Sequence, residues 1–142
     1  MSGTMCLRQL SLGYLDMAWF GKDNDVESVE EFEWNAVKKT ALMDKMPGAS
    51  ISCSLGHIFA GGYSAGYYSY KWAEVLSADA FSMFEEADLE NNHNIKVIGK
   101  KFKDTILSLG GSFSPLEVFK LFRGREPKTD SLIRHLGLSS VN

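Results

Sequence analysis

Apolar residues recur every three or four positions along most of the chain, which is the spacing of one face of an α-helix. The first such stretch predicts a helix over residues 5–20, ending where Gly21 breaks the pattern. No segment alternates apolar and polar residues as a half-buried strand does, and the sequence shows no internal repeat. The pattern therefore predicts an all-α fold of five or six helices. The apolar positions of the first helix are Leu7, Leu10, Tyr14 and Met17.

A second helix is predicted to begin near Asp25 or Ser28 and to run to about Met43. Ser28 and Glu31 form a capping-box pair, whose side chains can bind the free backbone N–H groups of the first turn. The next stretch, residues 46–62 (MPGASISCSLGHIFAGG), holds a proline and four glycines. These residues disfavour helix, so this stretch is predicted to be a long loop.

One long central helix is predicted over residues 62–87, because this stretch has no internal proline and a single internal glycine, Gly66. One face of that helix would carry Tyr63, Tyr67 and Tyr70. The opposite face is apolar as well, and a helix that is apolar on both faces is expected to be buried. The large aromatic residues expected in a core are Trp72, Phe81, Phe84 and Phe102.

Three further helices are predicted over residues 95–109, 114–124 and 129–135. The double glycine at 110–111 stops the first of them, and Ser114 followed by Pro115 opens the second. The positions of the first that are expected to face a core are Val97, Phe102, Ile106 and Leu109.

Two groups of charged residues in the C-terminal half have structural interpretations. The tail residues Arg123, Arg125 and Glu126 are predicted to tie the chain end to neighbouring helices. A run of acidic residues is predicted to form a solvated helix end, and it comprises Glu85, Glu86, Asp88 and Glu90.

Composition indicates a soluble globular protein, with 44% hydrophobic and 23% charged residues among 142. That length is typical of one domain, so residues 1–142 are expected to form a single domain. The net charge of −3 argues against nucleic acid or an anionic membrane as partner, and no apolar run is long enough to span a bilayer. Two cysteines and no recognisable leader predict free thiols in the cytoplasm.

The histidines and cysteines are the candidate catalytic or metal-binding groups of the chain. None of the three histidines opens a His-Glu-x-x-His pattern, so no metal site is expected within this chain. Cys53 and His57 are the only close nucleophile and base pair, which makes a self-contained hydrolase the weakest hypothesis.

A histidine followed by closely spaced tyrosines is the most unusual feature of the chain. His57 precedes GGYSAGYYSY, residues 61–70, in which three of the tyrosines share the predicted helical face. Their phenols could act together as hydrogen-bond donors, or they could form an aromatic stripe that packs against neighbouring helices. Spacing alone leaves both interpretations open.

Three segments in order carry a resemblance to a known family. They are CSLGHIFAGGYSAGYYSYKWAEVLSADAFSMFEEADLEN, KFKDTILSLGGSFSPLEVFKLFRGREP and LIRHLGL, with a weaker likeness in LRQLSLGYLDM near the start. Together they resemble the C-terminal end of the thimet oligopeptidase and oligopeptidase A family, the M3 peptidases. The resemblance spans most of the chain, and an ordered set of long motifs is specific.

The resemblance implies the helical C-terminal part of a zincin-type catalytic domain, in an enzyme that cleaves short peptides within a deep channel. It implies that Tyr70 and Tyr67 stabilise the oxyanion of the tetrahedral intermediate. His57, Gly61, Gly62 and Tyr63 would bind substrate, with the two glycines forming a flexible loop. The family's zinc ligands and catalytic glutamate lie upstream of the segment that this chain resembles.

The function expected from this resemblance is the substrate-binding and transition-state-stabilising segment of a zinc oligopeptidase, truncated and inactive alone. The alternative is a non-catalytic module that binds peptides or regulates a full-length peptidase. No cofactor is expected on this chain, whereas the full-length family uses zinc. Expected partners are short peptides, a zinc-bearing peptidase domain, or a second copy through exposed apolar surface. The expected location is the cytoplasm, with an organelle as the alternative.

Overall fold

The computed structural model describes residues 2–22 and 26–138, and every regular element in these ranges is a helix. The all-α prediction is confirmed, with seven α-helices and one π-helix among the described residues. Contacts divide the chain into two units, Met1–Lys71 and Trp72–Asn142. No helix of the described residues has the length and apolar character needed to cross a membrane.

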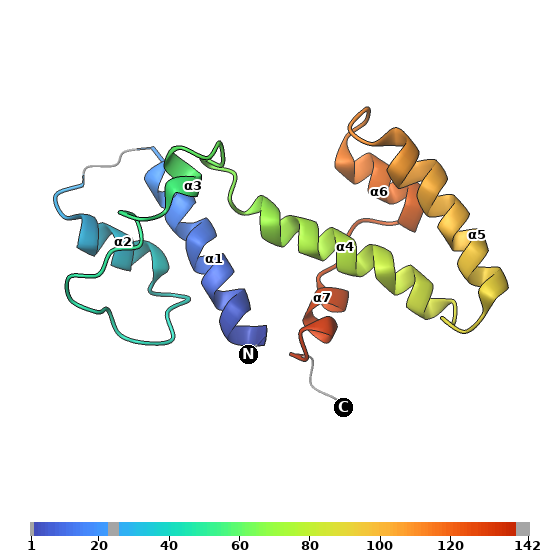
Figure 1. The fold of residues 1–142 in the computed structure, drawn as a ribbon, viewed down its shortest axis with the longest axis horizontal. Coiled ribbons are helices and arrows are strands. Elements are labelled where there is room, and N and C mark those ends of the chain that lie inside the picture. Colours follow the sequence, from blue (N-terminus) through green and yellow to red (C-terminus); the bar gives the residue numbers. More distant parts are fainter. Residues whose placement is uncertain (1, 23–25, 139–142) are drawn as a thin grey trace. The chain divides into compact units, whose positions relative to one another are not determined.

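The first unit is built on helix α1 (Ser2–Trp19), which packs against α2 (Val29–Val37). A short helix, α3 (Gly56–Phe59), lies beside α1 in Figure 1 and falls within the stretch predicted as a loop. The core of this unit joins Leu12 of α1 and Ile58 of α3 to Tyr67, which follows α3 in the chain.

Helix α2 begins as predicted, because the Ser28 side chain accepts a hydrogen bond from the Glu31 N–H. It ends at Val37, six residues before the predicted end. The backbone N–H and the hydroxyl of Thr40 both donate to the Val37 carbonyl at 2.9 Å, which closes the chain into a turn. Thr40 also shares a 2.7 Å hydrogen bond with Ser11 of α1, so tertiary contacts decide where α2 stops.

A buried carboxylate holds the loop after α2. Glu33 accepts hydrogen bonds from the backbone N–H groups of Ile51 and Ser52, each at 2.9 Å, and from the Ser50 and Ser52 hydroxyls. Burial alone would raise the Glu33 pKa, but these hydrogen bonds outweigh it and lower the pKa. The loop is therefore ordered by one side chain of α2.

The second unit packs α5 (Asn92–Phe102), the π-helix η1 (Lys103–Leu107) and α6 (Pro115–Arg123) with α4 (Ser69–Glu86), and closes with α7 (Asp130–His135). Ser114 and Pro115 open α6 as predicted, and Gly124 ends it in the left-handed conformation. The residues of its buried core are Ala80, Ile98, Phe119 and Phe122.

Three residues of this unit that were predicted to lie in a core do not. Val97 is 57% exposed, and Ile98 occupies the core in its place, since Ile98, Phe102 and Ile106 form a stripe at four-residue spacing. Phe81 and Trp72 are about half exposed, because the core of the second unit covers only the Ala80 side of α4. Phe84 and Phe102 are partly buried against that core, as expected.

The acidic helix end is not simply solvated. Glu86 pairs with Arg123, and Glu85 pairs with Arg134 and lies 3.0 Å from His135 Nε2. Glu86, Asp88 and Glu90 are exposed as predicted, whereas Glu85 is partly buried, and the C-terminal tail brings cations to Glu85 and Glu86.

The prediction that Arg123 and Arg125 bind the C-terminal tail to a neighbouring helix is confirmed. The residue that both arginines contact, Asp79, was not identified from the sequence. Asp79 is fully buried in α4 and accepts two hydrogen bonds from Arg125, at 2.5 and 2.6 Å. It also accepts the Lys128 N–H at 2.7 Å, and Arg123 lies 3.4 Å away. Glu126 pairs with Lys120 instead.

Low pH is expected to weaken the interactions between Asp79 and the C-terminal tail. Burial opposes ionisation of Asp79, but the hydrogen bonds of Arg125 and Lys128 and the charge of Arg123 outweigh it and lower the Asp79 pKa to about 2. A folded-state pKa below the unfolded value stabilises the fold above about pH 4, and this contribution of about 2 kcal/mol is lost as pH falls toward 2. Thermal unfolding followed by circular dichroism across that range checks it. Asp79→Asn should show the smaller acid effect, and an equal effect in both proteins would contradict the expectation.

Candidate functional site

The segment between α3 and α4 is folded into hydrogen-bonded turns. Gly61 N–H donates to the Gly56 carbonyl at 3.0 Å, and Tyr63 N–H donates to the His57 carbonyl at 3.3 Å. The Ser64 hydroxyl donates to the Ile58 carbonyl at 2.6 Å. The residues that follow His57 are thereby folded back against α3.

The two glycines have a steric role in this turn. A Cβ atom at Gly61 would lie 2.8 Å from the His57 carbonyl oxygen and 2.9 Å from its Cα, closer than real contacts allow. Gly62 has φ of +79°, in the left-handed region that favours glycine. Position 61 therefore requires glycine in this structure, and position 62 favours it.

Gly61→Ala is expected to destabilise the first unit by about 1–3 kcal/mol, because the backbone must shift to accept a methyl group. Gly56→Ala is the matched control, since a Cβ atom there meets nothing within 4 Å. Urea unfolding of both variants measures the difference. Equal stabilities would show that the turn relaxes without cost.

Helix α4 begins at Ser69, so the prediction that it begins at Gly62 is wrong. Ala65 has φ of +51°, which no α-helix contains. The carboxylate of Asp16 accepts the backbone N–H groups of Ala65 and Tyr67, each at 2.9 Å. In a continued helix these N–H groups would bind carbonyls of the preceding turn, so Asp16 replaces helical hydrogen bonds.

Four rings converge on this turn, and we call His57, Tyr63, Tyr67 and Tyr70 the tyrosine cluster. Tyr63 and Tyr70 are stacked, with ring centroids 5.3 Å apart and planes 25° apart. Tyr67 lies 5.1 Å from Tyr70, and His57 lies 5.7 Å from Tyr63 and 6.3 Å from Tyr67. The tyrosines do not share a helical face as predicted, because only Tyr70 belongs to α4, but the turn brings them together.

The side chains of the tyrosine cluster differ in how exposed they are, and this decides which of them can contact a ligand. His57 is exposed, and Tyr63 and Tyr70 are 37% and 38% exposed. Tyr67 is only 8% exposed and forms part of the core of the first unit, while its hydroxyl donates to Gln9 Oε1 at 3.3 Å. Tyr67 therefore fits the packing interpretation, and the other three rings remain accessible to a ligand.

The Tyr70 hydroxyl is kept in its protonated form. A side-chain hydrogen bond with Tyr63, followed by partial desolvation and the neighbouring phenols, raises the Tyr70 pKa above its ordinary value of 10.0. A protonated phenol is a hydrogen-bond donor, so Tyr70 can donate throughout the neutral and moderately alkaline range.

The described residues do not fit a zinc site. Among residues 2–22 and 26–138, no three His, Cys, Asp or Glu side chains lie close enough together to hold a metal ion. His57 is the only histidine of the tyrosine cluster, and its neighbours are phenols, which are not the usual ligands of zinc.

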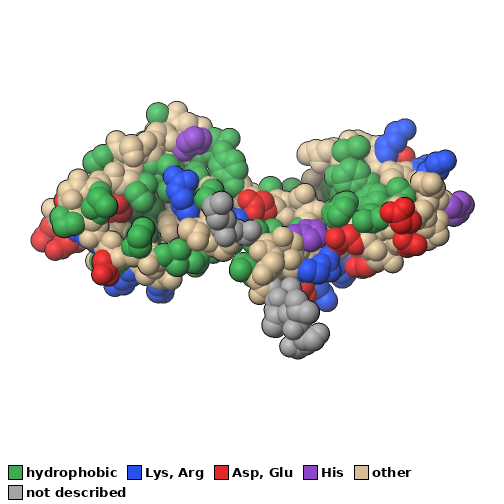
Figure 2. All heavy atoms as spheres, turned by 60° about the horizontal axis from the view of Figure 1, so that its bottom comes forward, with side chains coloured by type: hydrophobic (Ala, Val, Ile, Leu, Met, Phe, Trp, Pro, Cys, Tyr) green, Lys and Arg blue, Asp and Glu red, His purple; other side chains and the backbone are tan. Residues whose placement is uncertain are grey.

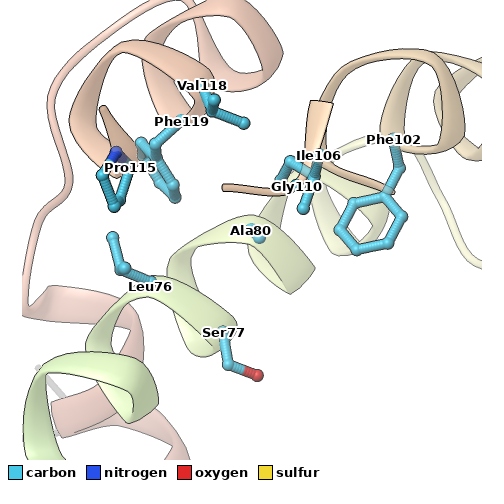
Figure 3. A pocket seen from close by; sticks show the side chains of 9 residues that line it. All are labelled: Leu76, Ser77, Ala80, Phe102, Ile106, Gly110, Pro115, Val118 and Phe119. Carbon is cyan, nitrogen blue, oxygen red and sulfur yellow. The ribbon is translucent and has the colours of Figure 1, made fainter. Parts of the chain in front are cut away.

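A pocket of about 310 Å³ lies in the second unit, between α4, α5 with η1, and α6 (Figure 3). Its walls are mostly apolar, from Leu76 and Ala80 of α4 to Phe102, Ile106 and Phe119, and Ser77 is the one polar side chain among them. No charged or titratable side chain lines it, so it offers apolar contact and no acid–base chemistry.

Sequence reasoning missed Asp16 and Gln9, whose side chains on α1 form hydrogen bonds with the segment carrying the tyrosine cluster. Asp16 lies four positions after the buried Leu12, and Gln9 lies three positions before it, so all three share one face of α1. A carboxylate on the buried face of a helix is the signal that could have identified Asp16, since a buried charge needs partners.

The sequence matches the Peptidase family M3 over residues 1–138. It is 48% identical over 143 aligned residues to the probable cytosolic oligopeptidase A of Arabidopsis thaliana, covering 99% of this chain and 20% of that protein. The organellar oligopeptidase A of the same plant is also 48% identical, with 99% and 18% covered. Oligopeptidase A of Escherichia coli (strain K12) is 44% identical over 136 residues, covering 93% of this chain and 19% of that protein.

The chain spans about a fifth of the length of these curated relatives. The family match nevertheless covers nearly all of its residues, including the tyrosine cluster and the Arg123–Arg125 tail. This chain belongs to the Peptidase family M3.

Proposed function

We propose that this chain supplies the substrate-binding and oxyanion-stabilising part of a zinc oligopeptidase that hydrolyses short peptides. The observation that carries the proposal is the accessible pair of phenols, Tyr63 and Tyr70, stacked beside the exposed His57 in a turn that requires glycine. Membership of Peptidase family M3 supports the peptide as substrate class.

The residues act on the reacting carbonyl as hydrogen-bond donors. When the carbonyl carbon of a peptide bond becomes tetrahedral, its oxygen gains negative charge, and a phenol O–H stabilises that charge more than the neutral carbonyl. Tyr70 is the main donor in this proposal, because it is accessible and its ring contacts both Tyr63 and Tyr67. His57 and Tyr63 flank it and hold the peptide backbone, while Tyr67 contributes its donor only when it leaves Gln9.

Zinc and the residues that bind it lie outside these 142 residues in this proposal, because the sequence has no His-Glu-x-x-His pattern. The chain alone is therefore expected to bind peptides without hydrolysing them. A zinc-bearing part of the same family is the partner that completes the enzyme.

A chimera tests the proposal. Residues 1–138 of this chain replace the matching segment of Escherichia coli oligopeptidase A, and cleavage of a quenched fluorescent peptide is measured with zinc present. The chimera is expected to cleave the peptide, and this chain alone is expected to be inactive. A folded, zinc-loaded chimera without activity would contradict the proposal, as would cleavage by the isolated chain.

The alternative function is a non-catalytic module that binds peptides, or that regulates a full-length peptidase. It is favoured by the exposure of His57, Tyr63 and Tyr70, which are accessible without any metal-bearing part. Calorimetric titration of short peptides into this chain and into Tyr70→Phe tests it. Absence of binding by both proteins would remove this function.

Exposed apolar side chains support a partner surface as part of the proposal. Figure 2 shows hydrophobic side chains at the surface. The exposed large hydrophobic residues include Met43 and Phe59 in the first unit and Trp72, Leu107, Phe113 and Leu121 in the second. We propose that further peptidase polypeptide, or a second copy of this chain, covers them. Light scattering of the isolated chain is expected to show self-association.

A cytoplasmic location belongs to the same proposal, because one relative at 48% identity is named a cytosolic enzyme. The other relative at that identity is named chloroplastic and mitochondrial. Cell fractionation distinguishes the two locations.

A further inference from the structure

Asp16 is a fully buried carboxylate that the proposed peptide chemistry does not use. Its two oxygens accept one backbone N–H each, from Ala65 and Tyr67, at 2.9 Å. These donors lie 49 and 51 residues further along the chain, on either side of Gly66. The carboxylate thus binds the backbone in the middle of the segment that carries the tyrosine cluster.

The two hydrogen bonds decide between competing backbone conformations. The sequence of residues 62–87 favours a continuous helix, yet Ala65 has φ of +51°, which disfavours a residue with a Cβ atom. Hydrogen bonds to a charged group are stronger than those between neutral groups, so Asp16 can offset that cost. As a result, this turn places Tyr63 against Tyr70 with their rings stacked.

A second side chain on the same face of α1 acts on the hydroxyl of Tyr67. Gln9 lies seven positions before Asp16, two helical turns away, and its Oε1 accepts the Tyr67 hydroxyl at 3.3 Å. Leu12 lies between them and packs against Ile58 and Tyr67. One face of α1 therefore contacts both the backbone and the phenol of Tyr67.

We propose that Asp16 is a positioning residue of the tyrosine cluster, which holds residues 65–67 in the turn that assembles its rings. Gln9 assists by directing the Tyr67 hydroxyl. For its effect on peptide recognition this inference rests on the proposed function, but the arrangement of the turn can be measured without any peptide.

The test compares Asp16→Asn with Glu33→Gln in this chain. Both changes neutralise a buried carboxylate of the first unit that accepts two backbone N–H groups, but Glu33 holds Ile51 and Ser52 instead. Asp16→Asn is expected to speed amide hydrogen exchange at Ala65 and Tyr67 by about tenfold to a hundredfold. Glu33→Gln is expected to leave those two amides unchanged and to speed exchange at 51 and 52.

Peptide titration is the second readout. Asp16→Asn is expected to weaken peptide binding by about tenfold or more, whereas Glu33→Gln retains the affinity of the unmodified chain. If Asp16 only stabilised the first unit, Asp16→Asn and Glu33→Gln would weaken peptide binding to a similar extent. If the unmodified chain binds peptide, equal affinities of the two variants would therefore overturn the proposal.

The outcomes separate the two ideas. Unchanged exchange at Ala65 and Tyr67 in Asp16→Asn overturns the positioning role, whatever the peptide result. If the unmodified chain binds no peptide, the proposed function is overturned, while the exchange data still decide the positioning role. A further measurement does not depend on whether Asp16→Asn folds. Amide hydrogen exchange of the unmodified chain should show protection at Ala65 and Tyr67, and unprotected amides there would also overturn the proposal.

Discussion

Tyr70→Phe is expected to lower the turnover of the chimeric peptidase by about a hundredfold to a thousandfold. The change removes one hydroxyl and keeps the ring that stacks on Tyr63, so the cluster retains its shape. The loss should fall on kcat more than on KM, because the phenol binds the charged transition-state oxygen more strongly than the neutral carbonyl. Steady-state kinetics with a quenched fluorescent peptide measures both constants.

Tyr68→Phe is the matched control for this prediction. Tyr68 is 57% exposed, lies within two residues of Tyr70 in the sequence, and belongs to none of the ring contacts of the tyrosine cluster. It should retain nearly full turnover. A similar loss in both variants, or a loss confined to KM in Tyr70→Phe, would contradict transition-state stabilisation by Tyr70.

Asp79→Ala is expected to cost about 3–5 kcal/mol of unfolding free energy in the second unit, because it leaves Arg125 and Arg123 without their buried partner. The Asp79 carboxylate also binds the Lys128 N–H, so the tail after α6 should detach from α4. Urea unfolding, together with proteolysis of the tail near Pro127, measures the two effects.

Asp104→Ala removes an ion pair of the same unit as a control. Asp104 pairs with Lys100 on the exposed surface of α5 and η1, and exposed pairs contribute little because water screens them. Its stability should stay close to that of the unmodified chain. If Asp79→Ala lowered the unfolding free energy as little as Asp104→Ala, the interactions of Asp79 with the tail would not be a major source of stability.

The helical class and the order of the C-terminal helices could be predicted from sequence, because local signals define them. Ser28 caps α2, Pro115 opens α6 and Gly124 ends it, each through hydrogen bonds or backbone angles of neighbouring residues. Arg123 and Arg125 were also correctly expected to tie the tail, since guanidinium groups beside a chain end need acceptors.

The turn that assembles the tyrosine cluster could not be predicted from local sequence. Residues 62–68 are compatible with a helix, and the contact that prevents it comes from Asp16, about 50 residues earlier in the chain. Long-range hydrogen bonds of this kind override local propensity. The rings of Tyr63, Tyr67 and Tyr70 do lie close together, but the predicted shared helical face is wrong, because a turn brings the rings into contact.

Affinity for a tetrahedral mimic is the most direct measurement of what the tyrosine cluster recognises. A peptide whose amide is replaced by a phosphinate carries anionic oxygens where the oxyanion forms, so Tyr70 can donate to it. Calorimetry should show this chain binding the phosphinate at least about tenfold more tightly than the matching amide peptide, with the preference lost in Tyr70→Phe. Equal affinity for the two peptides, or a preference that survives Tyr70→Phe, would contradict oxyanion recognition by these phenols.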